Sequence, residues 1–209
     1  MKKILLLIII CSVTFACKKN HVVHADKLHN GDIIFQTSTS AQSKAIQLAT
    51  HSEYSHCGVI YEDDGQWYVF EAVQPVKKTP LEDWIDRGQN DRYVIKRLKD
   101  TTALTPSALK KMKAVAKTMN GKDYDLYFEW NNDRIYCSEL VWKLYKESTG
   151  LEIGHLKQLK DFDLTAPPVK LKLKERYGNN IPMDEKVISP KDVYDSELLE
   201  TIAGTYVAP

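Results

Sequence analysis

The chain has 209 residues, of which 43% are hydrophobic and 27% are charged, with 29 basic and 28 acidic side chains. This composition is typical of a folded globular domain and excludes a disordered or fibrous chain. No basic stripe with interleaved aromatic residues is present, so we expect no nucleic acid partner. Because the sequence also has no internal repeat, no GxGxxG motif and no phosphate-binding loop, we expect no cofactor.

The first 16 residues are predicted to be a signal peptide. Lys2 and Lys3 precede an apolar run that starts at Ile4, and a basic segment followed by a short apolar segment is typical of export signals. The run is shorter than the roughly 20 residues that cross a bilayer. Residues 14–17, Thr-Phe-Ala-Cys, resemble the lipobox of bacterial lipoproteins, although Thr14 replaces the usual Leu.

That resemblance implies acylation of Cys17 and attachment of the protein to a membrane of the bacterial cell envelope through its N-terminal lipid, on the periplasmic or the surface side. Ordinary signal cleavage and a retained anchor are the alternatives. Residues 17–28 are short and polar and are predicted to be a tether. We expect residues 29–209 to form one domain, because the chain is long enough for one substantial core and shows no internal boundary.

The first predicted elements are a strand at residues 31–36 and a helix at residues 40–50. Residues 54–61 and 66–73 are then expected to be paired strands, because Asp-Asp-Gly between them is a hairpin signal. Side chains alternate between the two faces of a strand, so His56 and Cys57 should point to opposite faces. Antiparallel pairing of the two strands should bring His56 close to Glu71.

The remaining pattern predicts short helices and strands. A short helix is expected at 79–86 with Pro80 in its first turn, a strand at 93–98, and a helix at 105–119 capped by Thr105. Residues 161–168 have the composition of an irregular loop. Lysine and leucine alternate over residues 170–176, which predicts a strand with one solvated face. Ser189 should cap one more short helix.

Cys137 is the candidate nucleophile, because it stands where an amphipathic helix is expected to begin. Apolar residues recur behind it at helical spacing, and Asn131, Asn132 and Asp133 form a turn before it. The positive end of a helix dipole lowers a cysteine pKa and favours the reactive thiolate. A small buried core residue is the alternative interpretation of Cys137. Glu139 in the same first turn is expected to complement the helix dipole rather than to act in catalysis.

A cysteine nucleophile needs a base, and the base needs an orienting partner. His56 and Glu71 are the candidates, with His51 as the second choice for the base. Of the four cysteines, Cys11 lies in the predicted signal peptide and Cys17 is the first residue of the predicted tether. Cys57 and Cys137 lie in the predicted domain. Cys57 and Cys137 are either a disulfide or one core residue and one nucleophile. No CxxC or CxxH spacing occurs, so no metal site is expected.

Three short stretches resemble the YiiX/YebB-like members of the NlpC/P60 cysteine hydrolases: residues 54–60 (Tyr-Ser-His-Cys-Gly-Val-Ile), 70–72 (Phe-Glu-Ala) and 136–140 (Tyr-Cys-Ser-Glu-Leu). These enzymes are circularly permuted relatives of papain. Here too the histidine and the glutamate precede the cysteine, and the resemblance extends from about residue 31 to residue 196. It implies an α+β, permuted papain-like fold in which an antiparallel sheet packs against helices, including the helix of the nucleophile.

The resemblance also implies Cys137 as nucleophile, His56 as base and Glu71 as the polar third residue. Cys57 departs from the aliphatic residue usual in the family, and we interpret it as core filler. The family uses a tyrosine near the nucleophile, and the candidates are Tyr54, Tyr136, Tyr177 and Tyr194.

The predicted activity is hydrolysis of an amide or ester through a thioester. The predicted substrate is a cell-wall peptide or a lipid or acyl amide. The aromatic residues between positions 124 and 130 would suit an acyl chain, and plain core packing is the simpler interpretation of them. A non-catalytic module that binds lipid or peptide in a papain-like cleft, and a purely structural envelope lipoprotein, are the alternatives from other functional classes.

Overall fold

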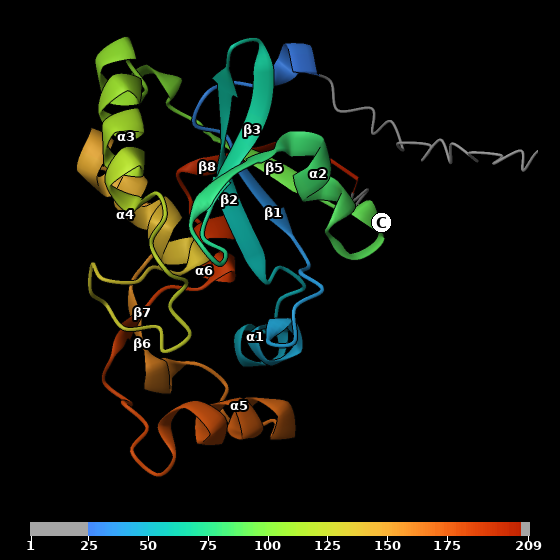
Figure 1. The fold of residues 1–209 in the computed structure, drawn as a ribbon, viewed down its shortest axis with the longest axis vertical. Helices are drawn as coiled ribbons and strands as arrows, with labels where there is room; N and C mark the ends of the chain where they lie inside the picture. The colour runs from blue at the N-terminus through green and yellow to red at the C-terminus, as the bar shows by residue number, and fades with distance from the viewer. Residues whose placement is uncertain (1–24, 206–209) are drawn as a thin grey trace, which may run out of the picture.

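The computed structural model describes residues 25–205 (Figure 1). Within that range the main sheet has six strands in the order β4-β3-β2-β1-β5-β8, and every neighbouring pair is antiparallel. The strands are β1 (Ile33–Gln36), β2 (His56–Asp63), β3 (Gln66–Glu71), β4 (Lys77–Pro80), β5 (Val94–Leu98) and β8 (Leu199–Gly204). The predicted α+β class with an antiparallel sheet is confirmed.

Helices cover both faces of this sheet. In Figure 1, α3 (Pro106–Met119) and α4 (Cys137–Thr149) lie on one side and α2 (Leu81–Asp86) lies on the other. Side chains of β2 alternate between two apolar clusters: Cys57, Val59 and Tyr61 join the cluster under α3 and α4, and Ile60 joins the one under α2. The predicted alternation along this strand is therefore confirmed, and the core is a sheet between two helical layers.

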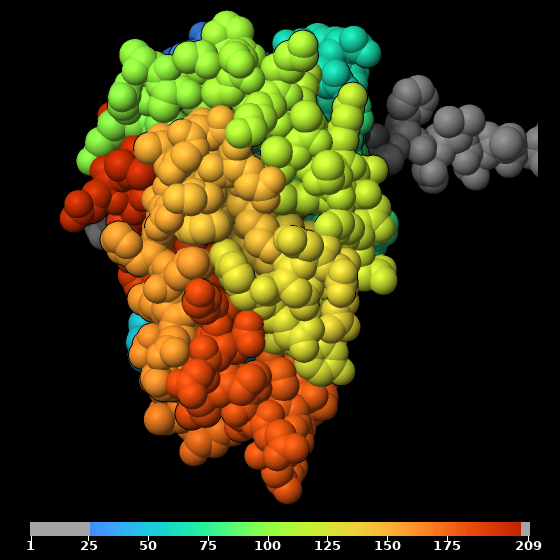
Figure 2. Space-filling model, turned by 90° about the vertical axis from the view of Figure 1, so that its left-hand side faces the viewer, coloured from blue at the N-terminus to red at the C-terminus, as the bar shows by residue number. Residues whose placement is uncertain are grey.

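The lower part of the molecule is less regular. It contains α1 (Ser43–Thr50) and α5 (Pro167–Tyr177), which pack together, and a small sheet of β6 (Lys157–Gln158) and β7 (Lys186–Val187). The short helix α6 (Pro190–Tyr194) leads back toward the main sheet. In Figure 2 the segment that includes α5, in orange, forms the narrow end of the molecule below α3 and α4.

Several predicted elements are present with small shifts. Thr105 caps α3 by accepting a hydrogen bond from the Ala108 amide (3.1 Å), and Ser189 caps α6. Short 3-10 turns complete the chain: η1 (Ala25–Lys27), η2 (Gln89–Asp91), η3 (Thr101–Ala103) and η4 (Leu159–Asp161). The part of the chain that the structure describes contains no helix long and apolar enough to cross a membrane.

The strand predicted over residues 170–176 is wrong, because this segment is in helix α5. Pro167 and Pro168 start the helix and Gly178 follows its last residue, and these are the usual signals at the two ends of a helix. The alternation of lysine and leucine is short enough to fit either structure. Its side chains are mostly exposed, so burial does not enforce the two-residue period.

Three other differences concern the edges of the domain. Strand β4 pairs with β3 and includes Thr79 and Pro80, so the helix predicted over residues 79–86 begins at Leu81. Strand β8 was not predicted. The predicted tether ends in ordered structure, because Leu28 is buried in the core cluster under α2 and the Lys27 carbonyl accepts a hydrogen bond from Arg97 (2.6 Å). The signal peptide and Cys17 lie outside the described residues.

Candidate active site

Cys137 is the first residue of α4 and is almost fully buried, with 2% of its surface exposed. Tyr136 precedes it in an extended conformation and serves as the N-cap of the helix. The loop before the helix is held by a bridge between Tyr124 and Ile135. The first amides of a helix have no partner within the helix, so this end of α4 carries partial positive charge close to Cys137.

Glu139 has a structural role in this helix start. Its carboxylate accepts a hydrogen bond from the Tyr136 amide (3.2 Å) and forms a 2.7 Å ion pair with Lys143. Burial raises its pKa to about 7 against the opposing effect of Lys143. These contacts agree with the predicted role at the helix end.

His56 begins β2, and Glu71 ends β3 beside it. The register that pairs Val59 with Phe70 places Glu71 opposite Gly58 and diagonal to His56. Gly58 makes this approach feasible, because an added Cβ would lie 2.5 Å from Val69 Cγ1 and 3.3 Å from Glu71 Cβ. The result is a 2.6 Å hydrogen bond between His56 Nε2 and Glu71 Oε2.

Glu71 is completely buried and saturated with donors. Besides His56, it accepts hydrogen bonds from Thr79 Oγ1 (2.6 Å), Trp84 Nε1 (3.0 Å) and Arg87 (2.7 and 2.6 Å). Burial alone would raise its pKa, but the hydrogen bond from His56 and the positive charges of His56 and Arg87 lower the pKa to about 2. The carboxylate is thus held ionised and immobile behind the imidazole.

The His56 ring is held on one face by the Trp84 ring, with centroids 5.8 Å apart and planes 25° apart. Since Glu71 occupies Nε2, the other ring nitrogen remains available for Cys137, which interacts with the ring. Burial lowers the His56 pKa, but the hydrogen bonds to Cys137 and Glu71 outweigh it and raise the pKa to about 9. The structure therefore brings the three predicted site residues together.

Cys57 also reaches the sulfur of Cys137. The Cys57 side chain points to the face covered by α4, and the start of that helix places Cys137 across the end of β2. A hydrogen bond from Cys57 lowers the Cys137 pKa, burial opposes this, and the contact with His56 lowers it further. Burial and Cys137 raise the pKa of Cys57. Both thiols are free, and Cys57 is a neighbour of the candidate nucleophile as well as a core residue.

The tyrosine that reaches Cys137 is Tyr124, which the sequence did not single out for this role. The hydroxyl lines the same cavity as Cys137, and burial and its interaction with Cys137 raise the pKa of the hydroxyl. No sequence spacing indicates this contact, because Tyr124 lies in a loop that only the bridge to Ile135 brings to the helix start.

The four predicted tyrosines are engaged elsewhere. Tyr54 and Tyr194 stack with ring centroids 4.4 Å apart. The Tyr136 hydroxyl accepts from the Ile188 amide (3.2 Å), and the Tyr177 hydroxyl donates to the Tyr127 carbonyl.

His51, the second choice for the base, is also remote from this chemistry. It follows α1, its side chain is 72% exposed, and it forms a 3.1 Å ion pair with Asp163.

Two recesses meet at the candidate site. A narrow cavity of about 90 Å³ opens beside Cys137, and its walls are mostly apolar side chains of α1, α5 and the segments between them, including Ala45, Ile46, Ala49, Phe162, Leu164, Val169, Leu173 and Ile188. A groove of about 690 Å³ opens beside His56 and has more polar walls, including Gln36, Ser38, Ser55, Gln74 and Arg87. Both recesses are bordered by Gln42, Tyr124, Lys172 and Arg176.

One similar solved structure is described as the crystal structure of metalloprotein yiiX from Escherichia coli O157:H7. It is 50% identical, with a TM-score of 0.82 over 86% of this chain and 98% of that one. Its description calls that protein a metalloprotein. In residues 25–205 of the present chain, no three or more His, Cys, Asp or Glu side chains are grouped to hold a metal ion. The donor set does not fit such a site, and we derive no chemistry from a metal.

The chain is also similar to a curated protein, the uncharacterized protein YiiX of Escherichia coli (strain K12). The two are 51% identical over 173 residues, which are 83% of this chain and 85% of that protein. The model of the permuted papain-like amidase family YaeF/YiiX (C92) matches residues 27–203. The order of histidine, glutamate and cysteine along the chain agrees with such a permutation. On this evidence, the chain belongs to the permuted papain-like amidase family YaeF/YiiX.

Proposed function

We propose that this protein hydrolyses an amide or ester whose acyl part is apolar, with Cys137 as nucleophile, His56 as base and acid, and Glu71 as the residue that orients the imidazole. One observation carries the proposal: a free cysteine at a helix start interacts with a histidine whose Nε2 is fixed by a buried carboxylate. This arrangement favours a thiolate beside an imidazolium.

In the first half of the reaction the Cys137 thiolate attacks the carbonyl carbon and forms a tetrahedral oxyanion. The Tyr124 hydroxyl and the backbone amides at the start of α4 are the donors available for that oxyanion. The His56 imidazolium gives its proton to the leaving nitrogen or oxygen, the carbon–heteroatom bond breaks, and a thioester on Cys137 remains.

In the second half, His56 accepts a proton from a water molecule, and the oxygen of that water attacks the thioester carbonyl carbon. Breakdown of the second tetrahedral intermediate releases the carboxylic acid and returns the thiolate, next to a protonated His56. Glu71 stabilises the imidazolium in both halves without exchanging a proton, because its pKa of about 2 keeps it ionised.

The two recesses set the orientation of the substrate. Since His56 protonates the leaving group, the leaving group belongs in the groove that contains His56, which is the wider and more polar of the two recesses. The acyl part stays on Cys137 and belongs in the apolar cavity that contains it. A cell-wall peptide in the same orientation would place polar amide groups in the apolar cavity, at a cost of about 1–3 kcal/mol for each group without a partner. An acyl amide or ester fits better.

A comparison of substrates tests this proposal. Purified full-length protein in detergent is assayed for release of one polar amine from N-acyl amides of increasing chain length, and in parallel for cleavage of muropeptides, with Cys137→Ala as the control. We expect release from the acyl amides to increase with chain length and to be absent in the variant. Cleavage of muropeptides alone would overturn the acyl specificity, and equal turnover by Cys137→Ala would overturn the mechanism.

A non-catalytic binding module is distinguished by thiol reactivity. At neutral pH, dilute iodoacetamide should modify Cys137 faster than Cys57, because only Cys137 has a lowered pKa. Modification of both sites is followed by peptide mass spectrometry. Equal rates, or faster modification of Cys57, would favour the binding module, because binding requires no thiolate.

The envelope location is part of the proposal and depends on the sequence before residue 25. We propose that Cys17 is acylated and anchors the enzyme to a membrane. Cys17→Ser should move the protein from the membrane fraction to the soluble fraction after cell lysis, as followed by immunoblotting. Unchanged association with the membrane would contradict acylation at Cys17.

A further inference from the structure

Gln42 joins two residues that lie far from it in the sequence. Its Oε1 accepts a hydrogen bond from Arg176 (2.6 Å), and its Nε2 donates to the Tyr124 hydroxyl (2.9 Å). Gln42 is the N-cap residue of α1, Arg176 belongs to α5, and Tyr124 lies in the loop before α4. Three separate segments therefore meet at the border between the apolar cavity and the polar groove.

The donor and acceptor inventory fixes the direction of this chain of hydrogen bonds. A guanidinium only donates, so the amide atom next to Arg176 has to be the oxygen. The amide atom next to Tyr124 is then the NH₂ group, which only donates. The Tyr124 oxygen consequently accepts from Gln42, and its own hydrogen is free to be donated elsewhere.

The position of Tyr124 leaves that hydrogen available to the reacting sulfur. Tyr124 and Cys137 line the same cavity, and the interaction of the hydroxyl with Cys137 contributes to the raised pKa of the hydroxyl. If Gln42 were instead an acceptor, the hydroxyl would be drawn toward the amide and away from the sulfur. The orientation of one side-chain amide thus decides whether Tyr124 stabilises negative charge at the site.

We propose that Gln42 and Arg176 are positioning residues that compel Tyr124 to act as a hydrogen-bond donor to the Cys137 thiolate and to the oxyanion formed there, an inference that rests on the proposed function. Within residues 25–205, the hydrogen bonds of the two residues join them to each other and to Tyr124. They act through Tyr124, and the three form a line of donors that starts at a charged group and ends at the nucleophile.

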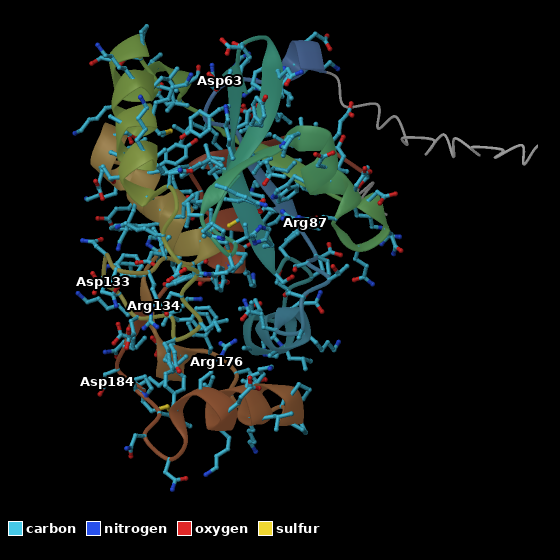
Figure 3. All side chains as sticks on the ribbon, viewed as in Figure 1. Asp63, Arg87, Asp133, Arg134, Arg176 and Asp184 are labelled. Atoms are coloured by element: carbon cyan, nitrogen blue, oxygen red, sulfur yellow. The ribbon has the colours of Figure 1, made fainter. Side chains whose placement is uncertain are left out.

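Arg176 is itself held in place for this role. Its guanidinium lies over the Phe128 ring, 5.0 Å from the centroid, and α5 packs against α1. Figure 3 labels Arg176 in the region between these two helices. Its contacts with the Gln42 amide oxygen and the Phe128 ring do not neutralise its positive charge, and that charge strengthens its hydrogen bond to Gln42.

Gln42→Glu is the substitution that should reverse the direction of the hydrogen bond between residue 42 and Tyr124. A carboxylate accepts from Arg176 as the amide does, but toward Tyr124 it can only accept, so it should attract the hydroxyl hydrogen. Tyr124→Phe removes the donor itself. Gln47→Glu is the matched control, because Gln47 lies on the same helix and its amide donates only to the Glu53 carbonyl (3.0 Å) at the surface.

The measurement is the pKa of Cys137, obtained from the pH dependence of its alkylation by iodoacetamide in the full-length protein and followed by peptide mass spectrometry. We expect Gln42→Glu and Tyr124→Phe each to raise this pKa by about one pH unit, as loss of one hydrogen bond to a charged group predicts. The double variant should show no further increase. Gln47→Glu should leave the pKa unchanged, and thermal unfolding verifies that each variant is folded.

The double variant separates this proposal from a simple charge or packing effect. If Gln42→Glu acts through its new charge, its effect persists when Tyr124 is Phe, and that additive result would overturn the proposal, as would an unchanged pKa in Gln42→Glu alone. Arg176→Met should raise the pKa of Cys137 when Tyr124 is present and leave it unchanged when Tyr124 is replaced by Phe. Any other result would show that Arg176 does not act through the hydrogen bonds of Gln42 and Tyr124.

The readout needs no substrate, so it is independent of the proposed reaction. Turnover by Cys137→Ala would refute the proposed hydrolase. If Cys137→Ala is inactive but the pKa of Cys137 is unchanged in Gln42→Glu, only the positioning role is refuted.

Discussion

The two sides of the candidate site are built in different ways. On one side, β2, β3 and α2 hold His56 and Glu71, and each contact follows from backbone register and a buried hydrogen-bond network. On the other side, α1, α5 and the loop before α4 meet through side chains, and residues such as Gln42 and Arg176 are only half-buried. Figure 3 labels one arginine of each side, Arg87 near the sheet and Arg176 near α5.

This difference separates the chemistry from the selection of the substrate. Proton transfer tolerates little displacement, and the sheet side fixes the imidazole between Trp84 and Glu71. The helical side forms the apolar cavity, whose shape depends on side-chain volume. Changes on the sheet side should therefore reduce the reaction for every substrate, and changes on the helical side should alter which substrate reacts.

The largest expected effect comes from Cys137→Ala, which removes the nucleophile that both sides serve. Turnover should fall at least about 10³-fold, to the level that binding and the oxyanion donors supply. The fold should persist, because the apolar face of α4 still packs, and Tm should change by no more than about 4 °C. Activity assays and thermal unfolding measure the two effects, and a large loss of Tm would mean that Cys137 is mainly a core residue.

Glu71→Gln should weaken the sheet side without dismantling it. The amide has one acceptor atom where the carboxylate has two, so it cannot accept from His56, Thr79 and Arg87 together. We expect kcat to fall about 10²-fold for all substrates, with KM nearly unchanged. Steady-state kinetics on acyl amides of two chain lengths checks this, and a variant as fast as wild type would remove Glu71 from the mechanism.

Ala49→Phe should change the helical side selectively. Ala49 lines the apolar cavity, and a larger side chain there shortens the space for an acyl chain. Each methylene excluded from it should reduce kcat/KM about fourfold, since burying one contributes roughly 0.8 kcal/mol. Short acyl amides should react as before. Ala114→Phe on the exposed surface of α3 is the control, and an equal loss for short and long chains would contradict the assignment of the cavity.

The alkaline limb of the pH dependence should report the sheet side. The His56 pKa is raised from 6.5 to about 9, so the imidazolium persists through neutral pH and is lost above about pH 9. The rate of thioester formation should then fall by about tenfold per pH unit.

By linkage, the stability that protonated His56 contributes is complete below pH 6.5 and is lost as the pH rises through about 9. A pH–rate profile that stays flat to pH 10 would exclude this ion pair.

The sequence identified the sheet side well, because its signals are local. The Asp-Asp-Gly turn fixes the hairpin, the two-residue period assigns His56 and Cys57 to opposite faces, and pairing then brings His56 to Glu71. The turn residues before Cys137 and the apolar spacing after it predicted the start of the helix equally well. By contrast, the alternation over residues 170–176 predicted a strand where α5 forms, because exposed side chains leave the period unconstrained.

The sequence by itself therefore determined the α+β class, the hairpin, the helix of the candidate nucleophile and the order of the three site residues. Only the tertiary structure decided that Tyr124 lines the cavity beside Cys137, that Cys57 is close to the same sulfur, and that Gln42 and Arg176 meet at the cavity. The physical reason is range. Strand and helix patterns repeat within a few residues, whereas these contacts join segments whose approach is set by packing of the whole core.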